Sequence, residues 1–236
     1  MHRFDVFHES LTPVLTAILA TLPHPEGPLL DVGCGAGAKA PVLHATLNLT
    51  TPLVGLDYTL EALHEAVACD RLLAVAGDAH ALPLRTASCG AAVCIATLGL
   101  LRDQRAALRE LRRAVRPGGW VLVVTATTAW VSWSAHMRDW IATRWACADA
   151  PGERLLTTSE PAADLGALLQ ETGWSEVRAG AFVIGVGGIA NQPVSPLLTR
   201  EAVQRYLTPT DVHDYEALVA DADIELLPLM LTAVGM

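Results

Sequence analysis

The stretch LLDVGCGAG, residues 29–37, constrains this chain more than any other part of its sequence. An apolar strand pattern ends in an acid and is followed by glycines at alternate positions, Gly33, Gly35 and Gly37. Glycine tolerates the positive φ of a tight strand-to-helix turn and lets a ligand lie directly against the backbone. The helix predicted over residues 39–47 points its first amides at whatever lies over the turn. The run therefore predicts a nucleotide-binding turn, but does not by itself select the cofactor.

Strand and helix patterns alternate along the chain. Short apolar runs predict strands at residues 29–33, 53–57, 72–76, 91–96 and 120–125. Apolar periodicity predicts helices at residues 11–22, 39–47, 60–68 and 103–115. Strands that alternate with helices form a parallel sheet covered on both faces. The sequence therefore predicts an α/β fold with a Rossmann-like, doubly wound, mostly parallel sheet.

Composition narrows the functional classes. The 236 residues are 52% hydrophobic and 17% charged, which is typical of one globular domain. A net charge of −9 argues against a nucleic-acid partner, because phosphate binding needs a basic face. No apolar run reaches the roughly 18 residues of a membrane span, and the first residues do not resemble a signal peptide. We therefore expect a cytoplasmic protein.

Arginine, lysine and cysteine add little chemistry at this stage. The arginines between Arg102 and Arg116 share a helix with a periodic apolar face and are interpreted mainly as its solvated side. The single lysine, Lys39, is interpreted as a compositional feature without a mechanistic role. The five cysteines have no metal-ligand spacing, so we expect no metal site and mostly buried, inert thiols.

Polar side chains follow four of the predicted strands. Asp31, Asp57 and Asp78 come at the ends of the first three, and Thr97 follows the fourth. The carboxyl ends of parallel strands meet at one sheet edge, where α/β proteins bind ligands. Asp57 also lies twenty residues beyond Gly37, a spacing typical of an acid that binds ribose hydroxyls. This edge is therefore predicted to bind a nucleoside-like ligand.

The motifs LLDVGCGAG, VGLD, GDAHALPL and AALRELRRAVRPGGWVLVV together resemble class I S-adenosylmethionine-dependent methyltransferases. The likeness is to the small-molecule branch that includes the ubiquinone and menaquinone methyltransferases. It covers residues 27–125, with a weaker similarity over a predicted helix at 165–174. The resemblance implies S-adenosylmethionine as cofactor. It also implies a seven-stranded sheet, completed by strands at 182–186 and 224–234, with the last strand antiparallel and with helical cover or lid insertions.

The resemblance also implies contacts with the methionine end of the cofactor. The residues expected beneath its methionine and ribose groups are those of the turn: Gly33, Cys34, Gly35 and Gly37. Asp31 would approach the ammonium group, often through water. The backbone near Ala96 and Thr97 would hold the same amine.

The remaining implied contacts are with the nucleoside. Asp57 would accept hydrogen bonds from both ribose hydroxyls, and Tyr58 would flank the adenine. Asp78 would meet the adenine amino group, and the backbone amide of Ala79 would reach a ring nitrogen. These roles fit the donors and acceptors present, since a diol and an exocyclic amine both need an acceptor.

The rest of the chain is expected to hold the methyl acceptor. We expect one methyltransferase domain over residues 1–236, with an N-terminal cover helix at 1–25 and the cofactor-binding half at 27–125. Cover or lid segments are expected at 126–160 and 188–222. The first of these carries tryptophans whose spacing places them in one broad arc of a helix, as a cover on the sheet, as a substrate pocket or as both: Trp130, Trp133, Trp140 and Trp145.

The predicted activity is methyl transfer from S-adenosylmethionine to an apolar or aromatic small molecule by in-line displacement. A carbon or alcohol acceptor needs a base, for which the candidates are His136, His213 and His8. A nicotinamide-dependent oxidoreductase shares the glycine turn, although no Tyr-x-x-x-Lys pair occurs here. A non-catalytic S-adenosylmethionine-binding protein is the other alternative. The sequence predicts neither the acceptor nor the oligomeric state.

Overall fold

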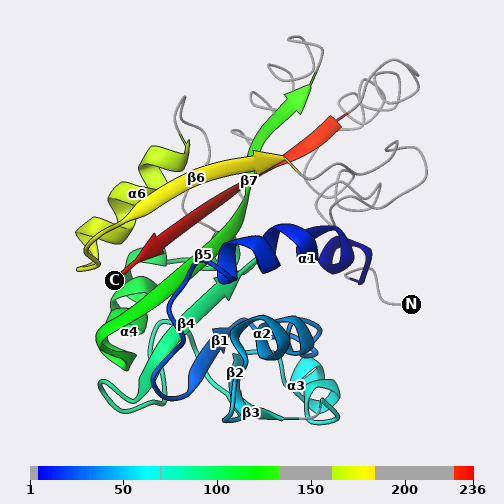
Figure 1. Cartoon of the computed structure of the whole chain (residues 1–236), viewed down its shortest axis with the longest axis vertical. Coiled ribbons are helices and arrows are strands. Elements are labelled where there is room, and N and C mark those ends of the chain that lie inside the picture. Colours follow the sequence, from blue (N-terminus) through cyan, green and yellow to red (C-terminus); the bar gives the residue numbers. More distant parts are fainter. Residues whose placement is uncertain (1–4, 70, 133–160, 184–225) are drawn as a thin grey trace.

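The computed structural model describes residues 5–69, 71–132, 161–183 and 226–236, and Figure 1 shows their arrangement. The helices are α1 (Asp5–Leu19), α2 (Ala40–Leu47), α3 (Leu60–Ala66), α4 (Gln104–Ala114) and α6 (Pro161–Glu171), with a 3₁₀ turn η1 at Leu98–Leu100. The strands are β1 (Leu29–Val32), β2 (Leu53–Asp57), β3 (Leu72–Ala76), β4 (Cys89–Ile95), β5 (Val115–Ser132), β6 (Arg178–Val183) and β7 (Leu226–Gly235).

The strands form one seven-stranded sheet in the order β3-β2-β1-β4-β5-β7-β6. The strands from β1 to β5 pair in parallel, whereas β7 runs antiparallel to both β5 and β6. The strand order reverses between β1 and β4, so the connections that leave these neighbouring strands diverge and open a crevice at their carboxyl ends. The predicted Rossmann-like sheet with an antiparallel last strand is confirmed.

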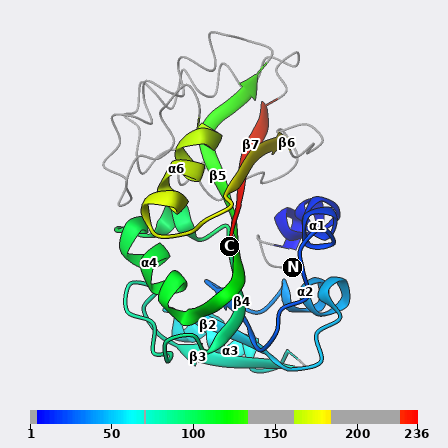
Figure 2. The same ribbon diagram turned by 60° about the vertical axis from the view of Figure 1, so that its left-hand side comes forward.

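Helices cover both faces of the sheet, as Figure 2 shows from the side. On one face α1 and α2 pack on the sheet through Leu15, Leu19 and Leu43, which are almost fully buried. On the other face α4 and α6 contribute Leu108 and Leu168 to a second apolar cluster. Alternate residues of the strands supply the two faces, as expected from the period of two along a strand. The sheet is therefore packed against helices on both faces.

The largest difference from the predicted elements lies in β5. The strand was expected over 120–125, but it runs from Val115 to Ser132. Its pairing partner on β4 moves from Cys89 to Ala91 while β5 advances from Val115 to Trp120, so the residues between them bulge out of register. Gly118 lies in this bulge with a φ of 79°. Residues 117–119, which precede the predicted strand, therefore form an irregularity within a longer strand.

The interpretation of Trp130 as part of a cover helix is wrong. Trp130 lies in β5 and pairs with Pro228 of β7. Antiparallel pairing with a strand almost a hundred residues away overrides the local helical periodicity. Trp133, Trp140 and Trp145 lie outside the described residues. No helix in the described ranges is long and apolar enough to cross a membrane.

Candidate functional site

The glycine turn connects β1 to α2 and is tied to the neighbouring strand β2. The amides of Gly33 and Cys34 both donate to the carbonyl of Leu56, at 2.8 and 3.1 Å. The amide of Gly37 then donates to the carbonyl of Cys34, at 3.0 Å. These bonds fix the turn at the carboxyl edge of the sheet, where the strand order reverses.

The three glycines are needed for different reasons. All have a positive φ: 72° at Gly33, 55° at Gly35 and 85° at Gly37. A Cβ on Gly33 would lie 2.0 Å from the Thr97 hydroxyl oxygen, and one on Gly37 would lie 2.7 Å from the Cys69 sulfur. For Gly35, no atom of the described residues lies within 4 Å of such a Cβ. Gly35 alone of the three therefore leaves open space above the backbone, where a ligand would rest.

Asp57 ends β2 and faces the turn directly. Its Oδ2 accepts a hydrogen bond from the Gly35 amide at 2.8 Å, and its Oδ1 accepts one from the Thr59 amide at 2.9 Å. Each carboxylate oxygen has further lone pairs, so both can accept another donor. The structure thus brings Asp57 and Gly35 together as the spacing suggested. Tyr58 follows with 81% of its surface exposed and can flank a ligand at this point.

Asp31 and Lys39 form a buried pair beneath the turn. The Lys39 ammonium donates to the carbonyl of Gly33 at 3.0 Å and lies 3.6 Å from Asp31 Oδ2. Burial raises the pKa of Asp31, the positive charge of Lys39 lowers it, and the charge of Asp57 raises it. Neither carboxylate oxygen of Asp31 has a hydrogen-bond donor among the described residues. Lys39, which from the sequence is interpreted only as a compositional feature without a mechanistic role, is thus a buried counter-ion of Asp31.

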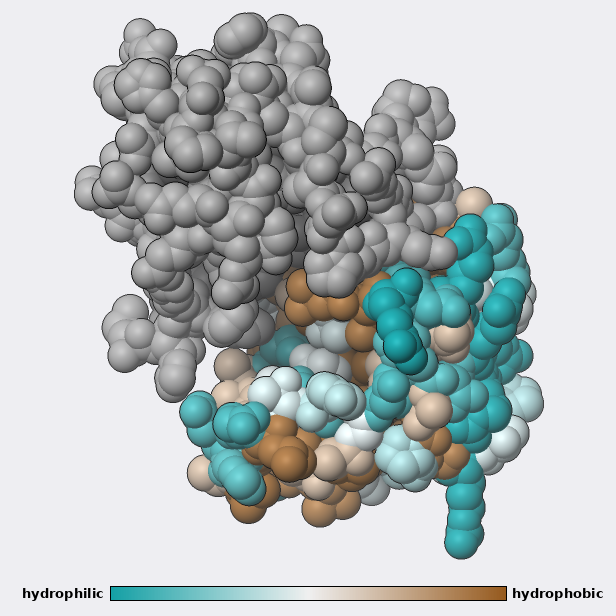
Figure 3. Space-filling model, turned by 180° about the vertical axis from the view of Figure 1, so that it is seen from behind, coloured by the Kyte–Doolittle hydropathy of each residue, from teal (hydrophilic) through white to brown (hydrophobic). Residues whose placement is uncertain are grey.

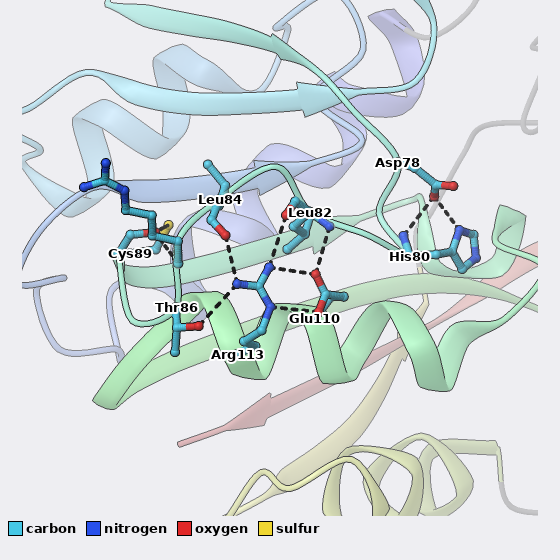
Figure 4. Close-up of polar contacts among 10 residues, drawn as sticks. Asp78, His80, Leu82, Leu84, Thr86, Cys89, Glu110 and Arg113 are labelled. Carbon is cyan, nitrogen blue, oxygen red and sulfur yellow. Dashed lines mark hydrogen bonds and ion pairs between the residues drawn. The ribbon is translucent and has the colours of Figure 1, made fainter.

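Asp78 follows β3 and is held by a histidine two residues later, as Figure 4 shows. Its Oδ1 accepts from the His80 amide at 2.8 Å and lies 2.5 Å from His80 Nδ1. His80 Nε2 accepts from the Asp103 amide at 3.3 Å, which indicates that Nδ1 carries the proton. These bonds from His80 lower the pKa of Asp78. Ala79 lies buried between the two residues.

The segment after Asp78 is tied to α4 by an arginine and a glutamate (Figure 4). Arg113 donates to the carbonyls of Leu82 and Leu84, at 3.1 and 2.8 Å, and pairs with Glu110 at 2.7 Å. Glu110 in turn accepts from the Leu82 amide at 2.9 Å. Arg113 is therefore a structural clamp and not part of a solvated face. The surrounding surface, which carries α4 and α6, is mostly hydrophilic, as Figure 3 shows.

Ala96 and Thr97 close the site after β4. Ala96 has a φ of 57°, which is unusual for a residue with a side chain and marks a strained position at the edge of the site. The Thr97 hydroxyl lies 3.2 Å from the carbonyl of Ile95 and 3.4 Å from that of Gly33. Thr97 therefore contacts Gly33, the first glycine of the turn, from the end of the neighbouring strand β4. Asp103 caps α4, accepting from the Ala106 amide at 2.8 Å.

The thiols of Cys34 and Cys69 donate to carbonyls of the glycine turn, those of Gly35 and Ala36, at 3.5 and 3.3 Å. Burial raises the pKa of Cys34 and of Cys94 to about 12 in each case, with a further contribution from the charge of Asp31. Such thiols remain protonated and unreactive near neutral pH. Within residues the structure describes, no cluster of His, Cys, Asp and Glu has the arrangement of a metal site.

The three candidate bases are not placed by the structure. His136 and His213 lie outside the described residues, and only the backbone of His8, in α1, is described. The cofactor-site residues, in contrast, all lie near the carboxyl ends of β1 to β4. Sequence reasoning missed Lys39, His80 and Arg113, whose roles depend on partners distant in the sequence or on burial.

The part of the sequence that forms this site is similar to a known protein family. The sequence model of the methyltransferase domain family matches residues 30–123. This stretch is therefore similar in sequence to a methyltransferase domain. It contains the glycine turn together with Asp57, Asp78 and Thr97, and ends within β5.

Two curated proteins are similar to part of the chain. An uncharacterised 37.1 kDa protein of transposon TN4556 in Streptomyces fradiae is 35% identical over 94 residues, 38% of this chain and 27% of that protein. An O-methyltransferase of Pyrenophora dematioidea is 33% identical over 101 residues, 41% of this chain and 38% of that protein. The chain thus spans less than two-fifths of the length of either relative.

Solved structures are similar over nearly the whole chain. The YcgJ protein of Bacillus subtilis superposes with a TM-score of 0.65 at 16% identity, covering 97% of this chain and 98% of that one. The [4+2]-cyclase SpnF superposes with a TM-score of 0.57 at 20% identity, covering 94% and 79%. The predicted Rossmann-like fold is therefore shared with these structures. Because one protein of this fold is a cyclase, the activity must be argued from the site.

Proposed function

We propose that the chain binds S-adenosylmethionine at the carboxyl edge of β1, β2 and β3 and transfers its methyl group to a small molecule. The observation that carries this proposal is the open space above Gly35, directly beside the Asp57 carboxylate. A ligand seated there needs close contact with the backbone and hydroxyl groups that an acid can accept. The methyltransferase domain match over the same residues supports it.

The residues present fit this cofactor. Asp31 offers two buried carboxylate oxygens without a hydrogen-bond donor among the described residues, which suits an ammonium group. Asp57 retains lone pairs for a ribose diol, and the exposed ring of Tyr58 lies next to it for the adenine. Asp78 keeps Oδ2 available for the adenine amino group, because His80 occupies Oδ1. We also propose that the backbone amide of Ala79 contacts an adenine ring nitrogen, and that the backbone near Ala96 and Thr97 holds the cofactor's amine.

The bound cofactor would supply an electrophilic methyl group on a sulfonium. The chain would contribute orientation and exclusion of water, which lower the barrier by holding the reacting groups in line. The glycine turn and Asp57 would fix the nucleoside. The apolar residues after β4, including buried Leu98 and exposed Leu100, would provide an apolar floor for the acceptor. The name of the Pyrenophora dematioidea relative, an O-methyltransferase, supports methyl transfer.

We propose that the acceptor is apolar or aromatic, as in the small-molecule branch of the family, and that His136, His213 or His8 acts as base where one is needed. Residues 1–236 would form a single cytoplasmic domain, with cover segments at 1–25, 126–160 and 188–222. If the variants His136→Ala, His213→Ala and His8→Ala all keep full turnover with the true acceptor, no histidine base operates.

The activity is tested with deuterated-methyl S-adenosylmethionine and a panel of phenols, thiols, amines and apolar acids. Mass spectrometry should find an acceptor that gains the labelled methyl group, with one S-adenosylhomocysteine formed per product. The matched control is Asp57→Ala, which removes the proposed ribose contact and should form little product at the same cofactor concentration. Binding of cofactor with no labelled product from any acceptor would favour the non-catalytic alternative.

A further inference from the structure

Lys39 is the only lysine in the sequence, and it is buried beneath the glycine turn with 5% of its side chain exposed. An ammonium group is rarely buried so deeply, because leaving water is costly unless the charge is paired. Its two partners are the carbonyl of Gly33, at 3.0 Å, and Asp31, at 3.6 Å. Gly33 lies in the turn and Asp31 lies in β1 just before it, so both are next to the position proposed for the cofactor.

The Asp31 carboxylate is buried, and among the described residues two charged side chains, those of Lys39 and Asp57, affect its ionisation. Lys39 approaches it from the start of α2, Asp57 from the end of β2, and the thiols of Cys34 and Cys94 lie close enough to sense its charge. Those thiols are neutral near pH 7, because their pKa is about 12. Among the groups described around Asp31, Lys39 is therefore the one whose positive charge opposes protonation of the carboxylate.

We infer that Lys39 is a positioning residue of the cofactor site: it keeps Asp31 ionised and fixes the Gly33 carbonyl, so that Asp31 can accept the cofactor's ammonium group. This inference rests on the proposed function. The ion-pair separation of 3.6 Å leaves both carboxylate oxygens without a described hydrogen-bond donor, ready to accept from a ligand. A lysine that only tied down the Gly33 carbonyl would not need to carry a charge.

The charge is tested by calorimetric titration with S-adenosylhomocysteine between pH 6 and pH 9. The variants are Lys39→Met, Lys39→Gln, which keeps a hydrogen-bond donor, and Lys39→Arg, which keeps the charge. We expect Lys39→Met and Lys39→Gln to bind more weakly than the wild type at the low end of this pH range and to recover as rising pH ionises Asp31. Each unit by which the pKa of Asp31 rises weakens binding by up to about tenfold while the carboxyl is protonated. Lys39→Arg should retain most of the wild-type affinity.

Equal weakening at every pH, or a Lys39→Gln variant that behaves as wild type, would overturn the inference, because a purely structural lysine predicts one of these results. If the wild-type chain itself does not bind S-adenosylhomocysteine, the proposed function fails instead. In that case a second measurement, made without any ligand, tests whether Lys39 controls the charge of Asp31.

That second measurement uses protein labelled with ¹³C at aspartate Cγ. The resonance of Asp31 is assigned by its loss in Asp31→Asn and followed as a function of pH without cofactor. Its titration midpoint should lie about one pH unit or more higher in Lys39→Gln than in the wild type, and Lys39→Arg should restore it. Identical midpoints in the wild type and Lys39→Gln would show that Lys39 does not control the charge of Asp31.

Discussion

The glycine turn offers a direct way to separate a ligand-binding position from a packing position. A Cβ added at Gly35 meets no described atom within 4 Å, whereas one added at Gly37 meets the Cys69 sulfur at 2.7 Å and Leu72 Cδ2 at 3.1 Å. Both glycines have a positive φ, so alanine costs about 1–2 kcal/mol of backbone strain at either site. Only Gly37→Ala adds overpacking, which costs about 1–3 kcal/mol more.

We therefore expect Gly35→Ala to lower the free energy of unfolding by about 1–2 kcal/mol, and Gly37→Ala to lower it by about 2–5 kcal/mol. Urea denaturation monitored by circular dichroism measures both values. In Cys69→Ala, which removes the closest atom, the Gly37→Ala substitution should cost about 1 kcal/mol less than in the wild-type background. Cys69→Ala alone is the control for that comparison.

The effects on ligand binding should have the opposite order. Gly35→Ala places a methyl group where the cofactor would lie, so we expect affinity for S-adenosylhomocysteine to fall at least tenfold, or roughly 1.4 kcal/mol. A folded Gly35→Ala protein that binds as tightly as the wild type would refute the assignment of the space above Gly35. If Gly37→Ala destabilises no more than Gly35→Ala, the packing argument is wrong.

Three further predictions concern the rest of the described site. Arg113→Ala should lower the free energy of unfolding by about 2–3 kcal/mol, because it removes bonds to two carbonyls and leaves the Glu110 carboxylate without its ion-pair partner. Arg109 is exposed on the same helix, so the control Arg109→Ala should change the free energy of unfolding by less than about 0.5 kcal/mol. The pKa of Asp78 is lowered from the ordinary value of an aspartate, so its contribution to stability is fully present above that ordinary value and is lost as pH falls through the lowered pKa. Urea midpoints measured from pH 2.5 to pH 6 should therefore show a weaker acid dependence in His80→Ala, and an unchanged profile would exclude the pair as its source. At pH 8 iodoacetamide should leave Cys34 and Cys94 unmodified in the native protein, because a thiol with a pKa of about 12 forms almost no thiolate. Rapid modification of either cysteine, detected by mass spectrometry, would contradict the described burial.

The parts of the fold that sequence predicted are those specified by local periodicity. The strands β2 and β3 begin and end at the predicted residues, since each is a short apolar run with clear polar boundaries. The meeting of Asp57 and Gly35 also followed from the sequence, because carboxyl ends of adjacent parallel strands lie at one edge. Asp103 caps α4, as its position just before an amphipathic helix favours.

The missed features depend on contacts between distant segments. The extension of β5 through Trp130 requires β7 as a pairing partner, and that partner is almost a hundred residues away. His80 matters because α4 places the Asp103 amide 3.3 Å from its ring, which no local pattern shows. Lys39 gave no sequence signal except its position two residues after Gly37, since burial is a property of the assembled layers.

The central claim is that this sheet edge binds S-adenosylmethionine and not a dinucleotide. Calorimetric titration of the chain with S-adenosylhomocysteine, and in parallel with NAD, tests it most directly. We predict saturable one-to-one binding of S-adenosylhomocysteine, weakened about tenfold or more in a folded Asp57→Ala variant by loss of a charged acceptor, and no binding of NAD. Absence of S-adenosylhomocysteine binding, or binding undiminished by Asp57→Ala, would contradict the account.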